Sequence, residues 1–251
     1  MGPIYLNRTV DISLTGIFGA IIAFSYLIPI GAMIGGTSIF SLSWIVDTIT
    51  GILLGPYWGG CAGLIGGIVG NLFKPSPLLP LAIFLPALAA IEAGLIVWRR
   101  WPIAAVLLAA LISVFLIMPV PGTHWPSELF GYSAWPAALF HFFGLAIIIF
   151  LGWKLPKVVR QGTSLYLFAG WMLTSYCGDI ARHMLGNILS AMVFSLPPAS
   201  FLLVIPNTFV EQTMYALFSA IIGVPLLYAI RSANLEIPLT HSLETGKLPE
   251  K

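Results

Sequence analysis

Long apolar runs alternate with short polar breaks along most of this 251-residue chain. The runs are about 15 to 20 residues long, which is close to the ~20 residues that an α-helix needs to cross a hydrocarbon core about 30 Å thick. They are rich in Leu, Ile, Ala and Gly and lack the strict alternation of barrel strands, so they favour helices. The pattern predicts eight helical spans, at about residues 11–30, 40–54, 59–73, 79–98, 103–120, 135–153, 164–194 and 206–230.

Composition supports the same fold class. Hydrophobic residues make up 59% of the chain and charged residues 8%, whereas an ordinary soluble domain carries about 25% charged residues. We therefore expect an all-α polytopic membrane protein, with one transmembrane domain over residues 1–231 and a flexible cytoplasmic tail over residues 232–251. The net charge of +2 is too small to indicate a nucleic-acid partner.

The basic residues predict an orientation. They gather at four places: before the first span (Arg8), after the fourth (Arg99 and Arg100), after the sixth (Lys154, Lys157 and Arg160) and after the last (Arg231). Four, two and two spans separate these places, so all of them can lie on one side. The positive-inside rule makes that side cytoplasmic. The prediction is a multi-pass protein of the cell membrane with both termini in the cytoplasm.

Polar residues inside the spans are the main functional candidates, because an unpaired charge in a membrane costs several kcal/mol. On the seventh span, Asp179, Arg182, His183 and Asn187 recur every three or four residues and form one polar stripe. With the predicted orientation, this stripe lies in the middle and outer part of the membrane.

The last span begins on the outer side with Asn207, Glu211 and Tyr215, and Asn71 ends the third span on the same side. These residues and the stripe should therefore converge. They are interpreted either as a pocket for a small polar ligand or as a structural network that pairs Asp179 with Arg182 and Glu211 with His183. Asp47 and Glu92 are interpreted either as packing groups, which is favoured, or as coupling residues, and His141 is interpreted as a structural group.

The first span carries a small-residue pattern. Gly16, Gly19, Ala20 and Ala23 repeat the small-xxx-small spacing that lets helices approach closely in lipid. The partner helix could belong to this chain or to another subunit. The glycine-rich connection at residues 31–39 could be either a lid over an outer site or a plain connector.

Several kinds of chemistry have no motif in the chain. We find no Walker A sequence, no histidine-rich metal motif, no nucleophile elbow and no phosphate-binding glycine motif. No cofactor, no metal and no catalytic residue is therefore predicted. The cluster of His, Asp and Arg leaves acid–base chemistry open.

Parts of the chain resemble the substrate-binding S components of energy-coupling factor (ECF) vitamin importers. The resemblance covers about 60% of the chain. It rests on the small-residue first helix, the glycine-rich loop 31–39, the turn Leu54-Gly55-Pro56-Tyr57-Trp58-Gly59, the glycine-rich run Cys61 to Asn71, and the last two spans with Arg182, Asn187, Pro206 and Glu211.

This resemblance implies a core of six helices, made here by spans one to four and seven to eight, with residues 103–153 as an inserted hairpin. It implies a vitamin-like ligand bound on the outer side by the first loop and the last helices. It also assigns the small face of the first helix to contact with a T subunit, which works with ATPase subunits. The expected function is substrate capture for an ATP-driven importer. A membrane enzyme acting on a lipid or isoprenoid and a self-contained secondary transporter are the alternatives.

Overall fold

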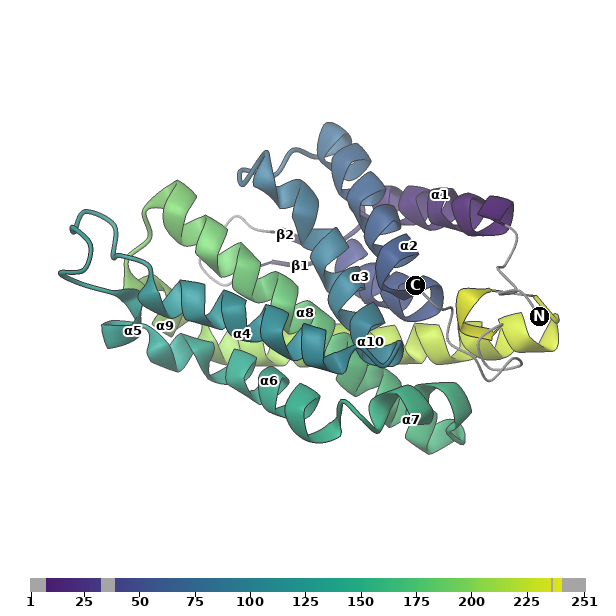
Figure 1. Cartoon of the computed structure of the whole chain (residues 1–251). Coiled ribbons are helices and arrows are strands. Elements are labelled where there is room, and N and C mark those ends of the chain that lie inside the picture. The colour runs from purple at the N-terminus through teal and green to yellow at the C-terminus, as the bar shows by residue number, and fades with distance from the viewer. Residues whose placement is uncertain (1–7, 33–38, 236, 241–251) are drawn as a thin grey trace.

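The computed structural model describes residues 8–32, 39–235 and 237–240. It is a bundle of helices with one short β-hairpin (Figure 1), so the all-α class is confirmed. The elements are α1 (Arg8–Ser25), β1 (Pro29–Ala32), β2 (Ile39–Ser41), α2 (Ser43–Phe73), the 3-10 helix η1 (Leu81–Ile83), α3 (Phe84–Val97), α4 (Trp101–Ile117), α5 (Phe130–Ser133), the 3-10 helix η2 (Trp135–Ala138), α6 (Leu139–Leu151), α7 (Leu155–Gln161), α8 (Ser164–Phe194), α9 (Pro198–Leu203) and α10 (Ile205–Ser232).

Each predicted segment contains a helix, and most of the helix ends lie within about three residues of the prediction. By length and composition, α2 and α10 can cross a membrane, and α6 with α7, bent by 77°, is a third candidate. The apolar helices α1, α3 and α4 are shorter. These two or three candidate spans indicate a membrane protein, while helix length alone does not establish eight crossings.

The long helix α2 is broken at Gly55. This glycine has φ 85° and ψ 176°, a conformation that favours glycine, and Pro56 follows it and cannot donate to a continuing helix. The chain folds back at this break. A methyl group on Gly59 would lie 2.8 Å from the Gly51 Cα atom, although eight residues of straight helix would separate the two positions by about 12 Å. The turn expected around Gly55 therefore separates two arms, 43–54 and 56–73.

The first arm of α2 is shorter than a full membrane span. Twelve residues of helix are about 18 Å long, which is shorter than a hydrocarbon core of about 30 Å. A two-stranded antiparallel hairpin, β1 with β2, precedes it, and the sequence did not predict these strands. Residues 33–38, at the centre of the predicted loop 31–39, lie outside the described residues.

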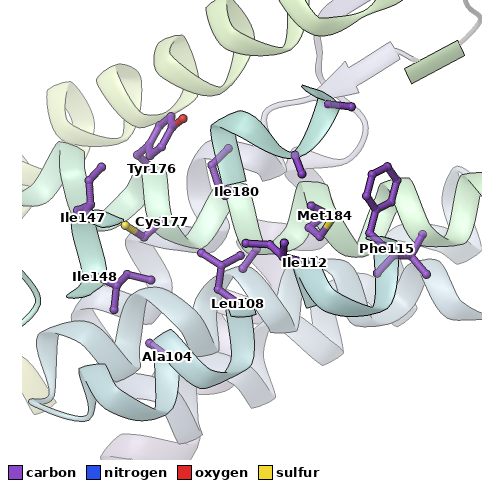
Figure 2. Packing of buried hydrophobic residues seen from close by; sticks show 14 of the residues in the cluster. Ala104, Leu108, Ile112, Phe115, Ile147, Ile148, Tyr176, Cys177, Ile180 and Met184 are labelled. Atoms are coloured by element: carbon purple, nitrogen blue, oxygen red, sulfur yellow. The ribbon is translucent and has the colours of Figure 1, made fainter. Parts of the chain in front are cut away.

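Helices α4, α6 and α8 form one side of the bundle around a shared apolar core. Figure 2 shows Leu108 and Ile112 of α4 next to Ile180 and Met184 of α8, with Ile148 of α6 beside them. All of these side chains are 6% exposed or less. The predicted hairpin 103–153 is thus packed against α8 and is part of the bundle.

Small residues let α2, α3 and α8 approach closely on the other side. A methyl group on Gly51 would lie 2.0 Å from the Ala90 carbonyl oxygen, and one on Gly178 would lie 2.8 Å from the Ala89 carbonyl oxygen. Backbone contacts of this kind are typical of helices packed in lipid, where van der Waals contact replaces the hydrophobic driving force. They hold the first arm of α2 deep in the bundle.

The small face of α1 is divided by this packing. Gly19 and Ala23 are buried, and a methyl group on Gly19 would approach Ile65 Cγ2 of α2 to 2.9 Å. Gly16 and Ala20 are exposed, with nothing within 4 Å of a methyl group on Gly16. The four residues therefore do not form a single partner surface, and only Gly16 and Ala20 remain available to another molecule.

The segment after α10 folds back onto the bundle. Ile237 is 5% exposed, and Leu239 is fully buried. Both belong to the apolar cluster that contains Leu227 of α10 and Val159 of α7. Residues 237–240, which fall in the tail predicted to be flexible, are therefore packed against the helices.

Candidate functional site

A buried ion cluster on Arg182 lies at the centre of the predicted site. Arg182 of α8 is 1% exposed. Its Nη1 donates to the Asp47 carboxylate of α2, and its Nη2 lies 3.0 Å from Asp179 Oδ1, one turn earlier on α8. The one-turn pairing of Asp179 with Arg182 was one of the two interpretations drawn from sequence. The partner from α2 was not part of it.

Arg182 also binds the aromatic residue that begins the first arm of α2. Its Nη2 donates to the Trp44 carbonyl oxygen at 3.2 Å, and its guanidinium carbon lies 3.8 Å from the Trp44 ring centroid. A desolvated cation over the face of a tryptophan ring is strongly favourable. The Trp44 ring in turn contacts Tyr215 of α10, with 5.5 Å between centroids. Aromatic groups from two helices thus flank the ion cluster.

This cluster has more carboxyl groups than cationic groups, and its hydrogen bonding is incomplete. Two carboxylates face one guanidinium. Within the described chain, Asp47 Oδ1, Asp179 Oδ2 and Arg182 Nε are buried without a hydrogen-bond partner. Buried polar atoms in folded proteins are usually satisfied, and each unsatisfied one is costly. A polar ligand that offers both donors and an acceptor would complete the network.

Two further residues belong to the surroundings of this cluster. The hydroxyl of Tyr26, just after α1, interacts electrostatically with Asp47, Arg182 and Asn71, and its ring packs against Gly70 of α2. Asn71 itself is committed to the backbone, because its amide donates to the Gly67 carbonyl at 2.7 Å and accepts from Ser76 N–H at 3.0 Å. These hydrogen bonds help to end α2. The role of Asn71 in ligand binding stays a prediction.

His183 and Asn187 form a second cluster that points away from the Arg182 cluster. His183 Nδ1 lies 3.1 Å from His141 Nε2 of α6, and the two rings are stacked with 5.3 Å between centroids. Asn187 Nδ2 lies 3.4 Å from the same Nδ1. In the contact between the two rings, one nitrogen donates and the other accepts. His141, which was interpreted as a lone structural histidine, is thus half of a pair.

A small hollow opens at this histidine pair. Its empty volume, which includes space open to solvent, is about 190 Å³. Its lining comes from η2, α6, α8, α9 and α10 and is mostly apolar apart from His183, Asn187 and Thr208: Ala137, Phe140, His183, Asn187, Phe201, Val204, Ile205 and Thr208. The hollow suits water or a small group of atoms rather than a whole vitamin.

The start of α10 contributes a third polar pair. Asn207 Nδ2 donates to Glu211 Oε1 at 2.6 Å. Tyr215, one turn further on, interacts electrostatically with Glu211 and with Arg182, so it links this pair to the ion cluster. The predicted pairing of Glu211 with His183 does not occur among the described contacts.

The predicted site residues are therefore distributed over three groups that share one region of the bundle. The reason lies in helix geometry: successive residues are rotated by about 100°, so Arg182 and His183 point to different neighbours. The stripe on α8 is in fact two faces. Asp179 and Arg182 point toward α2, while His183 and Asn187 point toward α6 and α9.

Asp47 and Gln212 were not among the predicted site residues. Asp47 could have been found, since an unpaired aspartate and an arginine at similar membrane depth are natural partners. Gln212 of α10 is fully buried, and neither of its amide atoms has a hydrogen-bond partner within the described ranges. It offers a donor and an acceptor one turn from Tyr215.

A hydroxyl network fixes α2, α8 and α10 toward the opposite end of the bundle from the histidine pair. Ser219 Oγ lies 2.7 Å from Ser175 Oγ and 3.1 Å from Thr48 Oγ1, and it accepts from Trp171 Nε1 at 3.2 Å. These four side chains are all buried. The network joins the three helices that carry the ion cluster, so it positions Asp47, Arg182 and Tyr215 relative to one another.

Metal binding finds no support in this region. Across residues 8–32, 39–235 and 237–240, no group of three or more His, Cys, Asp or Glu side chains could hold a metal ion. Glu92 of α3 is fully buried. Neither of its carboxyl oxygens has a hydrogen-bond partner in the described part of the chain.

Comparison with known proteins gives little further information. The chain is 22% identical over 190 residues to the uncharacterized protein MJ0923 of Methanocaldococcus jannaschii, a match that covers 75% of this chain and 61% of that protein. The chain thus spans less than two thirds of the length of this relative. No protein-family model matches it, and no solved structure matches it.

Proposed function

We propose that this chain is a substrate-capture membrane subunit of an ATP-driven importer of the ECF type, and that it takes up a vitamin-like small molecule from outside the cell. The observation that supports the proposal best is the ion cluster on Arg182. It is buried, incompletely hydrogen-bonded and flanked by Trp44 and Tyr215. A structural ion pair alone does not need aromatic walls or surplus acceptors.

The chemistry of the cluster suits a flat polar molecule. Trp44 and Tyr215 place aromatic rings beside the charged groups. Asp47 and Asp179 offer acceptor oxygens, and the Nε of Arg182 offers a donor. Gln212 adds a buried amide from α10. A heterocycle with both donors and acceptors on its edge would satisfy these groups together, and many vitamins carry such a ring.

Two features of the bundle support binding from the outer side. The basic residues Arg160 and Arg231 meet at one end, where Arg231 Nη2 donates to the Arg160 carbonyl at 3.0 Å. The Gly55 turn of α2 contacts Trp98 at this same end. Asp47 lies two turns before Gly55, and the hairpin of β1 with β2 lies beyond it. If the basic end is cytoplasmic, the ion cluster faces outward.

The proposal keeps eight membrane crossings and both termini in the cytoplasm. The second arm of α2 counts as one crossing, and the short first arm counts as another together with the β1–β2 hairpin before it. Helices α1, α2, α3, α8 and α10 form the core of six crossings, and α4 with α6 adds the inserted hairpin. The T subunit and the ATPase subunits are proposed partners. Their contact surface on α1 is the exposed part of its small face, Gly16 and Ala20, since Gly19 and Ala23 pack within the chain.

The test is ligand retention and uptake. Purified protein should retain a small molecule that native mass spectrometry detects, and cells that express the chain with its coupling subunits should take that molecule up. Alanine at Arg182 or at Glu211 should abolish uptake. Glu128, which is exposed in the connection between α4 and α5, is the control position for Glu211, and Glu128→Gln should leave uptake unchanged. Unchanged uptake in both alanine variants would refute the assignment of the site.

The Arg182 variant needs a check that it still folds, because Arg182 is buried. Glu211 is only partly buried, so Glu211→Gln keeps the shape of the side chain and is the safer variant. It should weaken ligand binding while the protein remains monodisperse in detergent. Activity on a lipid substrate without any ATPase partner would favour a membrane enzyme instead.

A further inference from the structure

The basic end of the bundle contains a cluster of N–H donors that have no acceptor. Arg160 of α7 is 7% exposed, and its guanidinium lies 5.1 Å from the Trp98 ring centroid at the end of α3. Arg231, at the end of α10, donates to the Arg160 backbone. Three helix ends therefore bring two arginines and a tryptophan together, although they are far apart in sequence.

All the unsatisfied polar atoms of this cluster are hydrogen-bond donors. Within the described chain, Arg160 Nε and Nη2, Arg231 Nε and Trp98 Nε1 are buried and have no acceptor. Ion pairs in the described residues involve Arg182 with its two aspartates and do not include these arginines. In the Arg182 cluster, carboxyl oxygens as well as an N–H group are unpaired. In the cluster at the basic end, only N–H groups are unpaired.

The electrostatics of the cluster are unfavourable as it stands. Burial, followed by the charge of nearby Arg99, lowers the pKa of Arg160 to about 10. Arg99 itself is exposed at the start of the next connection. A like charge beside a buried guanidinium is costly, and a bound anion would remove that cost. A planar guanidinium binds phosphate oxygens through two parallel hydrogen bonds.

We propose that Arg160, Arg231 and Trp98 form a binding site for a phosphate group at this end of the bundle. The site is separate from the Arg182 cluster and does not depend on the proposed transport function. An anionic phospholipid headgroup and a free phosphate offer the same chemistry. The lipid source fits the location, because the exposed Arg99 lies near Arg160 on a surface predicted to face the cytoplasmic leaflet.

The experiment uses the purified full-length protein in detergent after lipid removal. Phosphatidylglycerol, phosphatidylcholine and inorganic phosphate are each titrated, with binding followed by native mass spectrometry for the lipids and by thermal stabilisation for phosphate. Arg160→Gln removes two of the free donors. Lys157→Gln, an exposed position on the same helix α7, removes the same charge outside the cluster. Size-exclusion chromatography checks that each variant is folded.

If the site binds lipid, wild-type protein should retain phosphatidylglycerol in preference to phosphatidylcholine. Arg160→Gln should weaken that binding about tenfold or more, as expected for loss of charge-assisted hydrogen bonds, and Lys157→Gln should leave it nearly unchanged. If only inorganic phosphate binds with this pattern, the site stands and its ligand is a soluble phosphate.

Two results would overturn the proposal. One is the absence of any binding to wild-type protein. The other is an equal loss in Arg160→Gln and Lys157→Gln, which would show general charge attraction and no built site. If Arg160→Gln does not fold, Arg231→Gln gives the same comparison, since Arg231 is only partly buried and its Nε belongs to the same set of donors.

Discussion

The ion cluster predicts an unequal response to removal of its members. In Arg182→Gln, Asp47 and Asp179 are left buried together without a cation, because Arg182 is the partner of both. In Asp47→Asn, Arg182 keeps Asp179 at 3.0 Å and keeps the Trp44 ring. One carboxyl group then faces one guanidinium. The arginine variant should therefore be far more destabilised than the asparagine variant.

The magnitudes follow from burial. Removing one partner of a buried ion pair costs roughly 3–5 kcal/mol, because an uncompensated charge remains in a low dielectric. Arg182→Gln leaves two such carboxylates and should lie at or above the upper end of that range. Asp47→Asn loses one charge-assisted hydrogen bond, worth about 1.5–3 kcal/mol, and leaves Arg182 paired with Asp179. We expect a difference of at least about 2 kcal/mol between the variants.

The assay is unfolding of the purified protein by SDS in mixed micelles, followed by far-UV circular dichroism. The double variant Asp47→Asn with Arg182→Gln completes a thermodynamic cycle. It should be more stable than Arg182→Gln alone, because one of the unpaired carboxylates is gone, and the coupling should be about 1–3 kcal/mol. If Arg182→Gln unfolds no more readily than Asp47→Asn, the pair does not hold α2 to α8 in the way described.

Two further predictions concern close helix contacts. Gly51→Ala should destabilise the bundle by about 1–3 kcal/mol in the same SDS assay, because its methyl group would lie 2.0 Å from the Ala90 carbonyl oxygen. Gly186→Ala is the control, because a methyl group there meets nothing within 4 Å. Equal effects of the two substitutions would contradict the described packing of α2 against α3. Gly16→Leu should leave stability unchanged and weaken co-purification with a partner subunit, whereas Gly19→Leu should destabilise the chain itself. Normal partner recovery with Gly16→Leu would argue against a contact through α1.

Much of the fold was predictable from local pattern. Apolar runs long enough for membrane helices gave every main helix. The turn at Gly55 was visible because a glycine before a proline ends a helix. The one-turn pair of Asp179 and Arg182 followed from helix periodicity. The strands β1 and β2 were missed, because a short apolar stretch such as residues 29–32 reads as the continuation of a helix.

The candidate site was predictable in its region and less so in its connections. The sequence brought Asp179, Arg182, His183 and Asn187 together as one stripe, since their spacing repeats every three or four residues. The packed structure separates them, because a helix with neighbours on several sides turns each part of a wide stripe toward a different partner. His183 meets His141 for this reason, and Arg182 meets Asp47, which lies 135 residues earlier.

The sequence by itself determined that the chain forms apolar helices and that its buried charges are few. Both follow from composition and period, which each segment carries alone. Only the tertiary structure decided which charges pair, which half of the α1 small face is left exposed, and that Arg160, Arg231 and Trp98 share one end of the bundle. Such contacts depend on how helices far apart in sequence rotate and cross, and no single segment contains that information.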